Sequence, residues 1–262
     1  MLLSLTKLCT EKNLFAGRGF YGIFILPLLL FCTSLSAQIV LTSGQTADQY
    51  VEKIIGQGIE YSNAQIVGNS NQIATYTGGA GGGMQPTMNS GIVLSTGYVN
   101  TPTWLQGPSS IFRSTNTGGP TNSLELNALA GISSTYDVIY LEFDFIPLTD
   151  KLKINFQFGS EEYNEWVNTV FNDVFGFFIS GPGIATPFPG ENIAWAPNGA
   201  RVAVNAINRG TACPANTTVN CNSTNPIGMG NCYSNPFYYI DNCSGVYDNA
   251  MDGFTVMLVA QA

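Results

Sequence analysis

The chain has 262 residues, of which 45% are apolar and only 10% are charged, so it can bury a sizeable core. Its formal net charge of −8 argues against a partner held through a phosphate backbone, and we expect no nucleic-acid ligand. The sequence contains no histidine, which excludes Ser-His-Asp and Cys-His nucleophile systems and His-ligated zinc enzymes.

Residues 1–37 have the pattern of a secretory signal peptide. Three cations precede an apolar run of about twelve residues, and Ser34–Ala37 supplies small residues for cleavage. The run is shorter than the roughly 20 residues of a membrane-spanning helix. We therefore expect a mature chain of residues 38–262, secreted or on the outer cell surface and without a membrane span. Removal of the signal takes away three of 9 Lys+Arg and one of 17 Asp+Glu, which leaves a net charge of −10.

One short helix is predicted near the start of the mature chain. Thr46 and Gln49 have the spacing of a capping box, and Gly56 ends the apolar pattern that follows. The apolar residues at helical spacing are Ala47, Tyr50, Val51, Ile54 and Ile55. We expect this amphipathic helix to cover one end of a sheet.

After the helix the apolar periodicity is two, which predicts β-strands. Residues 137–147 and 151–158 alternate most clearly between apolar and polar side chains. Further strands are expected at residues 73–76, 91–95, 173–180, 201–206 and 254–260. Short strands separated by turn residues favour an all-β fold, a β-sandwich or jelly roll with one short N-terminal helix. We see no linker within 38–262 and expect a single domain.

The most informative stretch of the chain is residues 156–183. Four carboxylates lie within 13 residues of it, and side chains this crowded repel one another unless a cation, hydrogen bonds or protonation relieves them. Calcium is the natural partner, because this hard cation takes six to eight oxygen ligands. The expected ligands are Asp144, Glu161, Glu162, Asn172, Asp173 and Asp252. The alternative is that these acids cap turns, bind backbone N–H groups and keep the surface soluble.

Four cysteines are confined to a loop at residues 211–249. They are Cys213, Cys221, Cys232 and Cys243. In an exported chain they are most simply two disulfides, and three pairings are possible. Three Asn-x-Ser/Thr triplets, at Asn216, Asn222 and Asn242, have the pattern of glycosylation acceptors, although chance explains them equally well in a segment this rich in Asn and Thr.

The sequence resembles the choice-of-anchor L domain of bacterial surface and secreted proteins. The resemblance is carried by FQFGSEEYNEWVNTVFNDVFGFFISGPG at 156–183, ENIAWAP at 191–197, VAVNAIN at 202–208 and MDGFT at 251–255, with GIVLSTG at 91–97 and YLEFDFIP at 140–147 upstream. It covers about residues 40 to 262 and implies a β-rich extracellular module without an enzymatic activity. The chain ends directly after a predicted strand, so we expect a sequence truncated before its anchor or sorting domain.

These observations favour a non-catalytic module for adhesion or for matrix or glycan interaction, and they leave open whether calcium stabilises it or the acids act only through hydrogen bonds. Its partner would be an extracellular glycan or protein, contacted by aromatic residues of the loops. The residues considered for this contact are Trp104, Tyr163, Trp166, Tyr238 and Tyr239. One alternative is a glycoside hydrolase that uses Glu162 and Asp173, with Trp104, Trp166 and Trp195 stacking on sugar rings. The other is a purely structural spacer.

Overall fold

The computed structural model describes residues 39–78, 88–99, 115–163, 166–168, 170–186, 190–209, 234–242, 245–247 and 249–262. They belong to one compact unit, Ser36–Ala262. The predicted signal peptide, Trp104 and all four cysteines of the predicted disulfides lie outside the described residues.

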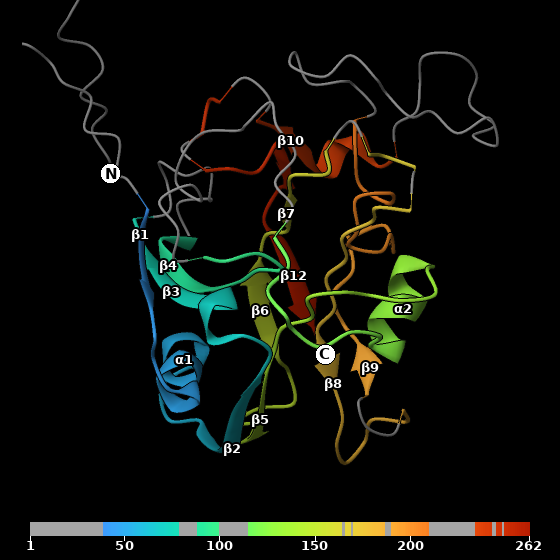
Figure 1. The fold of residues 1–262 in the computed structure, drawn as a ribbon. Helices are drawn as coiled ribbons and strands as arrows, with labels where there is room; N and C mark the ends of the chain where they lie inside the picture. Colours follow the sequence, from blue (N-terminus) through green and yellow to red (C-terminus); the bar gives the residue numbers. More distant parts are fainter. Residues whose placement is uncertain are drawn as a thin grey trace, which may run out of the picture. The chain divides into compact units, whose positions relative to one another are not determined.

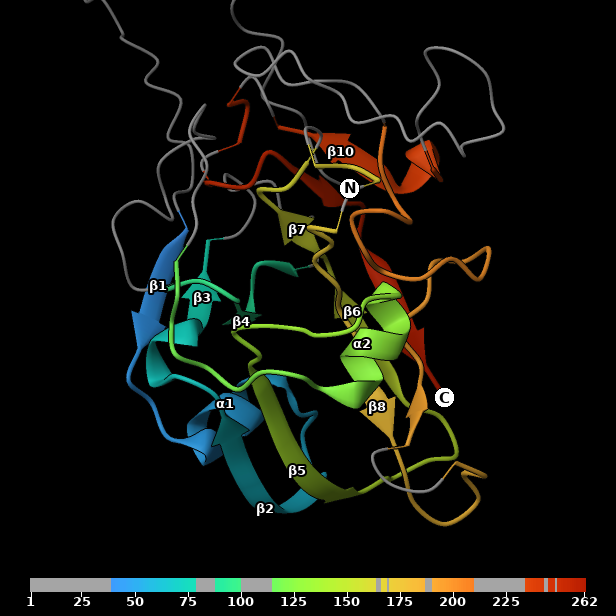
Figure 2. The same ribbon diagram turned by 45° about the vertical axis from the view of Figure 1, so that its right-hand side comes forward.

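The described elements are mostly short antiparallel strands (Figures 1 and 2). The strands are β1 (Val40–Ser43), β2 (Glu60–Val67), β3 (Ile73–Thr77), β4 (Ser90–Leu94), β5 (Tyr140–Ile146), β6 (Lys153–Phe156), β7 (Gly159–Ser160), β8 (Phe178–Ile179), β9 (Glu191–Asn192), β10 (Tyr239–Asp241), β11 (Gly253–Thr255) and β12 (Leu258–Gln261). The α-helices are α1 (Ala47–Ile54) and α2 (Leu124–Ala130), and single 3-10 turns lie at Ser70–Gln72 and Pro236–Tyr238.

Pairing among the described strands forms small antiparallel sheets. Two of them have three strands, in the orders β1-β3-β4 and β10-β11-β7. The pairs β2-β5, β6-β12 and β8-β9 form two-stranded sheets, and the register of β2 against β5 shifts between Ser62 and Gln65. The mostly-β class is therefore confirmed, and the sandwich or jelly-roll arrangement stays a prediction.

Helix α1 confirms the predicted capping box. The Thr46 hydroxyl accepts a hydrogen bond from the Gln49 backbone N–H, and the Gln49 side chain accepts one from the Thr46 backbone N–H. The helix buries Tyr50 and Val51, and the Tyr50 hydroxyl donates to the carbonyl of Ile73 on β3 at 3.2 Å. The amphipathic helix thus covers neighbouring strands, as expected (Figure 1).

Helix α2 was not predicted, although its boundaries carry ordinary signals. The Ser123 hydroxyl accepts a hydrogen bond from the Leu126 N–H, and Gly131 ends the helix in the left-handed region at φ +73°. A short polar N-cap and a C-terminal glycine are typical helix boundaries. The helix itself has only seven residues, which is too short for its apolar periodicity to stand out.

The strands predicted from the clearest alternation are confirmed, and three other predicted strands need correction. Of residues 173–180 only β8 is a strand, because Val174 joins Ala203 by an isolated bridge and the Phe177 N–H donates to the Asn192 side chain instead of to a ladder. The expected strand at 201–206 is absent: the chain turns, with the N–H groups of residues 206 and 207 donating to the Ala203 carbonyl. The expected strand at 254–260 divides into β11 and β12, which pair in different sheets.

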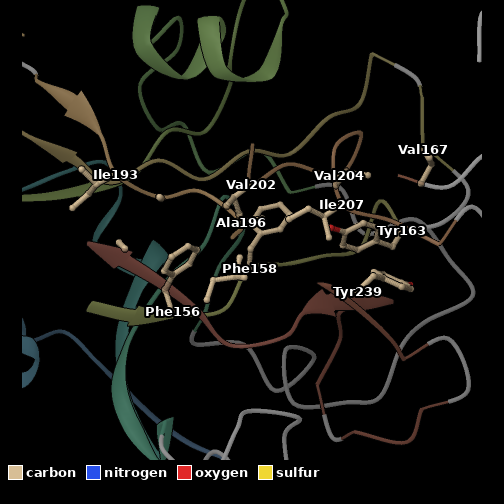
Figure 3. Close-up of a cluster of buried hydrophobic side chains, with 13 residues drawn as sticks. Phe156, Phe158, Tyr163, Val167, Ile193, Ala196, Val202, Val204, Ile207 and Tyr239 are labelled. Carbon is tan, nitrogen blue, oxygen red and sulfur yellow. The ribbon is translucent and has the colours of Figure 1, made fainter. Parts of the chain in front are cut away.

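The main core lies between the strands from the second half of the chain (Figure 3). Its buried members are Phe156, Phe158, Tyr163, Val167, Ile193, Ala194, Ala196, Val202, Val204, Ile207, Tyr239, Leu258 and Ala260. Phe156 and Phe158 alternate with exposed or half-buried residues, as the period of two predicts. No helix in the part of the chain that the structure describes is long and apolar enough to cross a membrane.

Candidate functional site

The buried hydroxyl of Ser160, on β7, joins the two ends of the acidic stretch, the segment 161–173 that carries the four crowded carboxylates. It donates a hydrogen bond to the Asp173 carboxylate at 2.8 Å and accepts one from the Glu162 backbone N–H at 2.9 Å. The Asp173 carbonyl in turn accepts a hydrogen bond from the Val204 N–H. Ser160 therefore holds the start of the acidic stretch against its end.

Burial raises the pKa of the Asp173 carboxyl, and the hydrogen bond from Ser160 opposes this effect only in part. The residue as a whole is partly exposed. Burial also raises the pKa of Tyr163 well above its ordinary value, with smaller contributions from Tyr239 and from Asp173. The negative charge of Asp173 is thus held in a poorly solvated place.

We expect the substitution Asp173→Asn to stabilise the protein at neutral pH. A raised pKa in the folded state means that protonated Asp173 favours folding below the ordinary Asp value, about pH 4, and that this stability is lost as the pH rises through the raised value. Asn carries no charge and keeps an oxygen that can accept from Ser160. Melting curves from pH 3 to pH 8 in the presence of a chelator should show an advantage for the variant that grows with pH. A difference independent of pH would contradict this account.

The predicted calcium ligands are only partly brought together. Ser160 pairs with Gly253, which places their neighbours Glu161 and Asp252 beside each other at the ends of β7 and β11. Asp144 instead lies on β5, where its carboxylate accepts a hydrogen bond from Asn63 at 2.6 Å.

The predicted ligand Asn172 uses its side chain in hydrogen bonds to the backbone of other segments. Its Nδ2 donates to the Ala130 carbonyl at 2.8 Å, and its Oδ1 accepts from the Asn205 N–H at 2.9 Å. Within the described ranges, no three His, Cys, Asp or Glu side chains are grouped so that they could hold a metal ion. Calcium binding stays a prediction of the sequence.

Two of the aromatic residues considered for ligand contact are core residues. Tyr163 is fully buried, and its ring packs on those of Phe158 and Tyr239, with centroid distances of 6.4 and 4.9 Å (Figure 3). Tyr239 is also buried. Neither ring is accessible to a ligand, so both residues act in packing and not in ligand contact. Tyr238 lies against the same core and is partly buried.

Phe171 and Trp195 are exposed to solvent, and Trp166 is partly exposed. Trp166 and Phe171 form an edge-to-face pair with centroids 4.8 Å apart, and 52% of the Phe171 surface is exposed. Trp195 is 37% exposed, and its indole Nε1 donates to the Asn192 carbonyl at 2.7 Å, which fixes the orientation of the ring. These three residues, Trp166, Phe171 and Trp195, are called the exposed aromatic set below.

Both segments that carry the exposed aromatic set are tied to the end of α2. The Asn172 side chain donates to the Ala130 carbonyl, and the Arg201 guanidinium donates to the Leu129 carbonyl at 3.1 Å. The last carbonyls of a helix have no partner within the helix, so they are ready acceptors for such side chains. The end of the acidic stretch and the segment around Arg201 thus converge on one helix end.

A family model for the Choice-of-anchor L domain matches residues 39–262. The chain belongs to this family. Comparison with curated proteins and with solved structures finds no match. Choice-of-anchor L domains are typical of secreted and surface proteins of bacteria, and the family is not known for a catalytic activity.

The family motifs of this Choice-of-anchor L domain build the fold around Tyr163 and Asp173. In the SEEY motif, Ser160 binds Asp173 and Tyr163 enters the core. In MDGFT, Gly253 lies under the ring of Tyr239, where a Cβ would come within 2.3 Å of the hydroxyl oxygen. The motifs therefore explain how the acidic stretch and the core are held together.

The structure excludes one of the three glycosylation triplets, while the other two lie outside the described residues. Asn242 is fully buried, and its Nδ2 donates to the Met251 carbonyl at 2.9 Å. A side-chain nitrogen in this position is not accessible to a glycosylating enzyme in the folded Choice-of-anchor L domain.

Sequence reasoning missed Arg201, Asn205 and Ser160 as organising residues. Asn205 accepts a hydrogen bond through its side chain from the Asn168 backbone N–H, and its own N–H donates to the Asn172 side chain. The run at 202–208, which contains two Asn residues, could have indicated this role of Asn205, because Asn is frequent where a side chain replaces a backbone hydrogen-bond partner.

Proposed function

We propose that this chain is a non-catalytic extracellular module that binds a glycan or matrix ligand through its exposed aromatic set. The observation that carries the proposal is the Trp166–Phe171 pair, since two rings held edge to face at 4.8 Å remain partly open to solvent. Val170, beside Phe171, is 76% exposed and extends the apolar surface. Aromatic rings supply large contact areas at little cost in conformational entropy.

The use of the acidic residues within the fold supports a non-catalytic role. Asp173 accepts from Ser160, and Asp144 accepts from Asn63. The hydrogen bonds of these carboxylates are thus made within the fold.

A glycoside hydrolase is the second candidate, and one specific observation favours it. Burial raises the pKa of the Asp173 carboxyl, and a raised pKa is what a general acid requires at neutral pH. Glu162 would be the second carboxylate of such an enzyme. Release of reducing sugar from a bound polysaccharide, abolished by both Glu162→Gln and Asp173→Asn, would replace the binding-module proposal by this one.

The binding proposal predicts that Trp166→Ala weakens ligand binding about tenfold or more, because truncation of a central Trp in a binding interface typically costs about 2 kcal/mol or more. A panel of glycans and matrix proteins identifies the ligand, and titration calorimetry then compares the parent with the variant. Tyr136→Ala is the matched control, since it removes an aromatic side chain that is 69% exposed and stands apart from the exposed aromatic set in the sequence. No binding to any member of the panel, or equal losses in both variants, would contradict the proposal.

Calcium stabilisation is tested separately. We propose that calcium is held by the neighbouring carboxylates of Glu161 and Asp252 together with backbone and water oxygens, and that its charge relieves the poorly solvated carboxylate of Asp173, which Ser160 holds close to Glu161. A ligand that binds only the folded state raises the melting temperature as its concentration rises. We expect millimolar calcium to raise the melting temperature of chelator-treated protein, with a smaller rise in Asp173→Asn. Identical melting temperatures with calcium and with chelator would show that the acids act only as hydrogen-bond partners.

A further inference from the structure

Trp195 and Arg201 stand directly opposite each other at the base of a tight hairpin. They form an antiparallel bridge, and the Ala196 N–H donates to the Ala200 carbonyl at 2.9 Å. The turn closes through a hydrogen bond from the Gly199 N–H to the Ala196 carbonyl, with Gly199 at φ +82°. Side chains opposite each other in an antiparallel pair lie on the same face, with Cβ atoms about 5 Å apart.

Both side chains are held in place and remain exposed. The indole of Trp195 is oriented by its hydrogen bond to the Asn192 carbonyl, and the Arg201 guanidinium is oriented by the Leu129 carbonyl. A guanidinium has five N–H donors, so a single bond to a carbonyl leaves donors for a ligand. Preorganised groups lose little conformational entropy when they bind.

An aromatic face beside a guanidinium fits a sugar that carries a carboxylate. The sugar ring can lie on the indole while the carboxylate accepts paired hydrogen bonds from the guanidinium, the geometry that arginine favours. The chain as a whole is acidic, with a net charge of −8, so an anionic polymer would not be held by its overall charge. Such a ligand would depend on this close contact.

We propose that the Trp195–Arg201 hairpin binds the uronic acid residues of an acidic polysaccharide. This inference rests on the proposed function and names its ligand class. An acidic peptide would satisfy the guanidinium equally well, but it offers no ring to stack on Trp195. The saccharide is therefore the ligand that uses both groups.

The test measures binding of tetragalacturonate, its methyl ester, a neutral tetrasaccharide and hexaglutamate to the purified chain by titration calorimetry. We expect binding of tetragalacturonate only, weakened about tenfold or more by Arg201→Gln, because hydrogen bonds to charged groups are the stronger ones. Arg201→Lys should retain part of the affinity, and Trp195→Leu should weaken binding. Lys151→Gln, which removes an exposed cation elsewhere, should leave binding unchanged.

Melting curves establish that each variant is folded. Failure to bind tetragalacturonate, equal binding of the methyl ester or of hexaglutamate, or affinity unaffected by Arg201→Gln would overturn the inference. If neutral glycans bind in a way that depends on Trp166 while the acidic one does not bind, the proposed function stands and this inference alone fails.

Discussion

Replacement of Tyr163 by alanine is expected to destabilise the protein by about 3–5 kcal/mol, the range found when large aromatic side chains are removed from a core. Tyr163 is fully buried and packs on Phe158 and Tyr239 (Figure 3). The loss of its ring would leave a cavity where β7, β10 and the acidic stretch meet. Urea denaturation, followed by fluorescence and by near-ultraviolet circular dichroism, measures the effect.

Two controls separate the ring of Tyr163 from other causes. Tyr163→Phe keeps the ring and should cost much less than Tyr163→Ala. Tyr136→Ala removes a side chain that is 69% exposed and should change stability by less than about 0.5 kcal/mol, as is usual for surface positions. A cost for Tyr163→Ala no larger than that for Tyr136→Ala would mean that the ring does not support the core.

The second large effect is expected for Gly253→Ala, at about 2–3 kcal/mol of destabilisation from overpacking. A Cβ at Gly253 would lie within 2.3–2.6 Å of the hydroxyl oxygen and two ring carbons of Tyr239. Tyr239 cannot move aside freely, because it is buried and packs on Tyr163 at a centroid distance of 4.9 Å. The added methyl group would therefore disturb β10, β11 and the core together. Thermal denaturation measures the loss.

Gly97→Ala is the matched control for Gly253→Ala, since a Cβ there meets only the Ser95 hydroxyl, at 3.7 Å. It should be nearly neutral. A double-mutant cycle with Tyr239→Ala tests the mechanism, because removal of the Tyr239 ring should remove most of the cost of the added methyl group. If Gly253→Ala destabilises the Tyr239→Ala variant as much as the parent, a clash with the Tyr239 ring is not the cause.

The sequence was most informative where one local rule governs the structure. Thr46 and Gln49 predicted the start of α1, and strict alternation predicted β5 and β6, because capping and a half-buried strand both depend on near neighbours. Residues 173–180 and 201–206 also alternate, yet side chains such as Asn192 and Asn172 satisfy backbone groups there that a regular strand would pair. Contacts between residues distant in sequence decide such segments.

The sequence predicted which residues belong to the candidate site better than it predicted how they are arranged in space. The acidic stretch was recognised, and Ser160 does join Asp173 to the Glu162 backbone. Tyr163 and Tyr239 were candidates for ligand contact as well as for packing, and the sequence could not decide between the two, because burial of a ring depends on strands that arrive from residues 239–260. Periodicity cannot identify such partners.

The hairpin of Trp195 and Arg201 has a mechanical consequence. Its flanking residues Ala194, Ala196 and Val202 are buried in the main core, so the hairpin is rooted there. A force applied to a ligand that is bound by Trp195 and Arg201 would reach the buried core through one or two peptide units. If the hairpin binds a ligand as proposed, a force that pulls on the ligand is therefore resisted by the buried core.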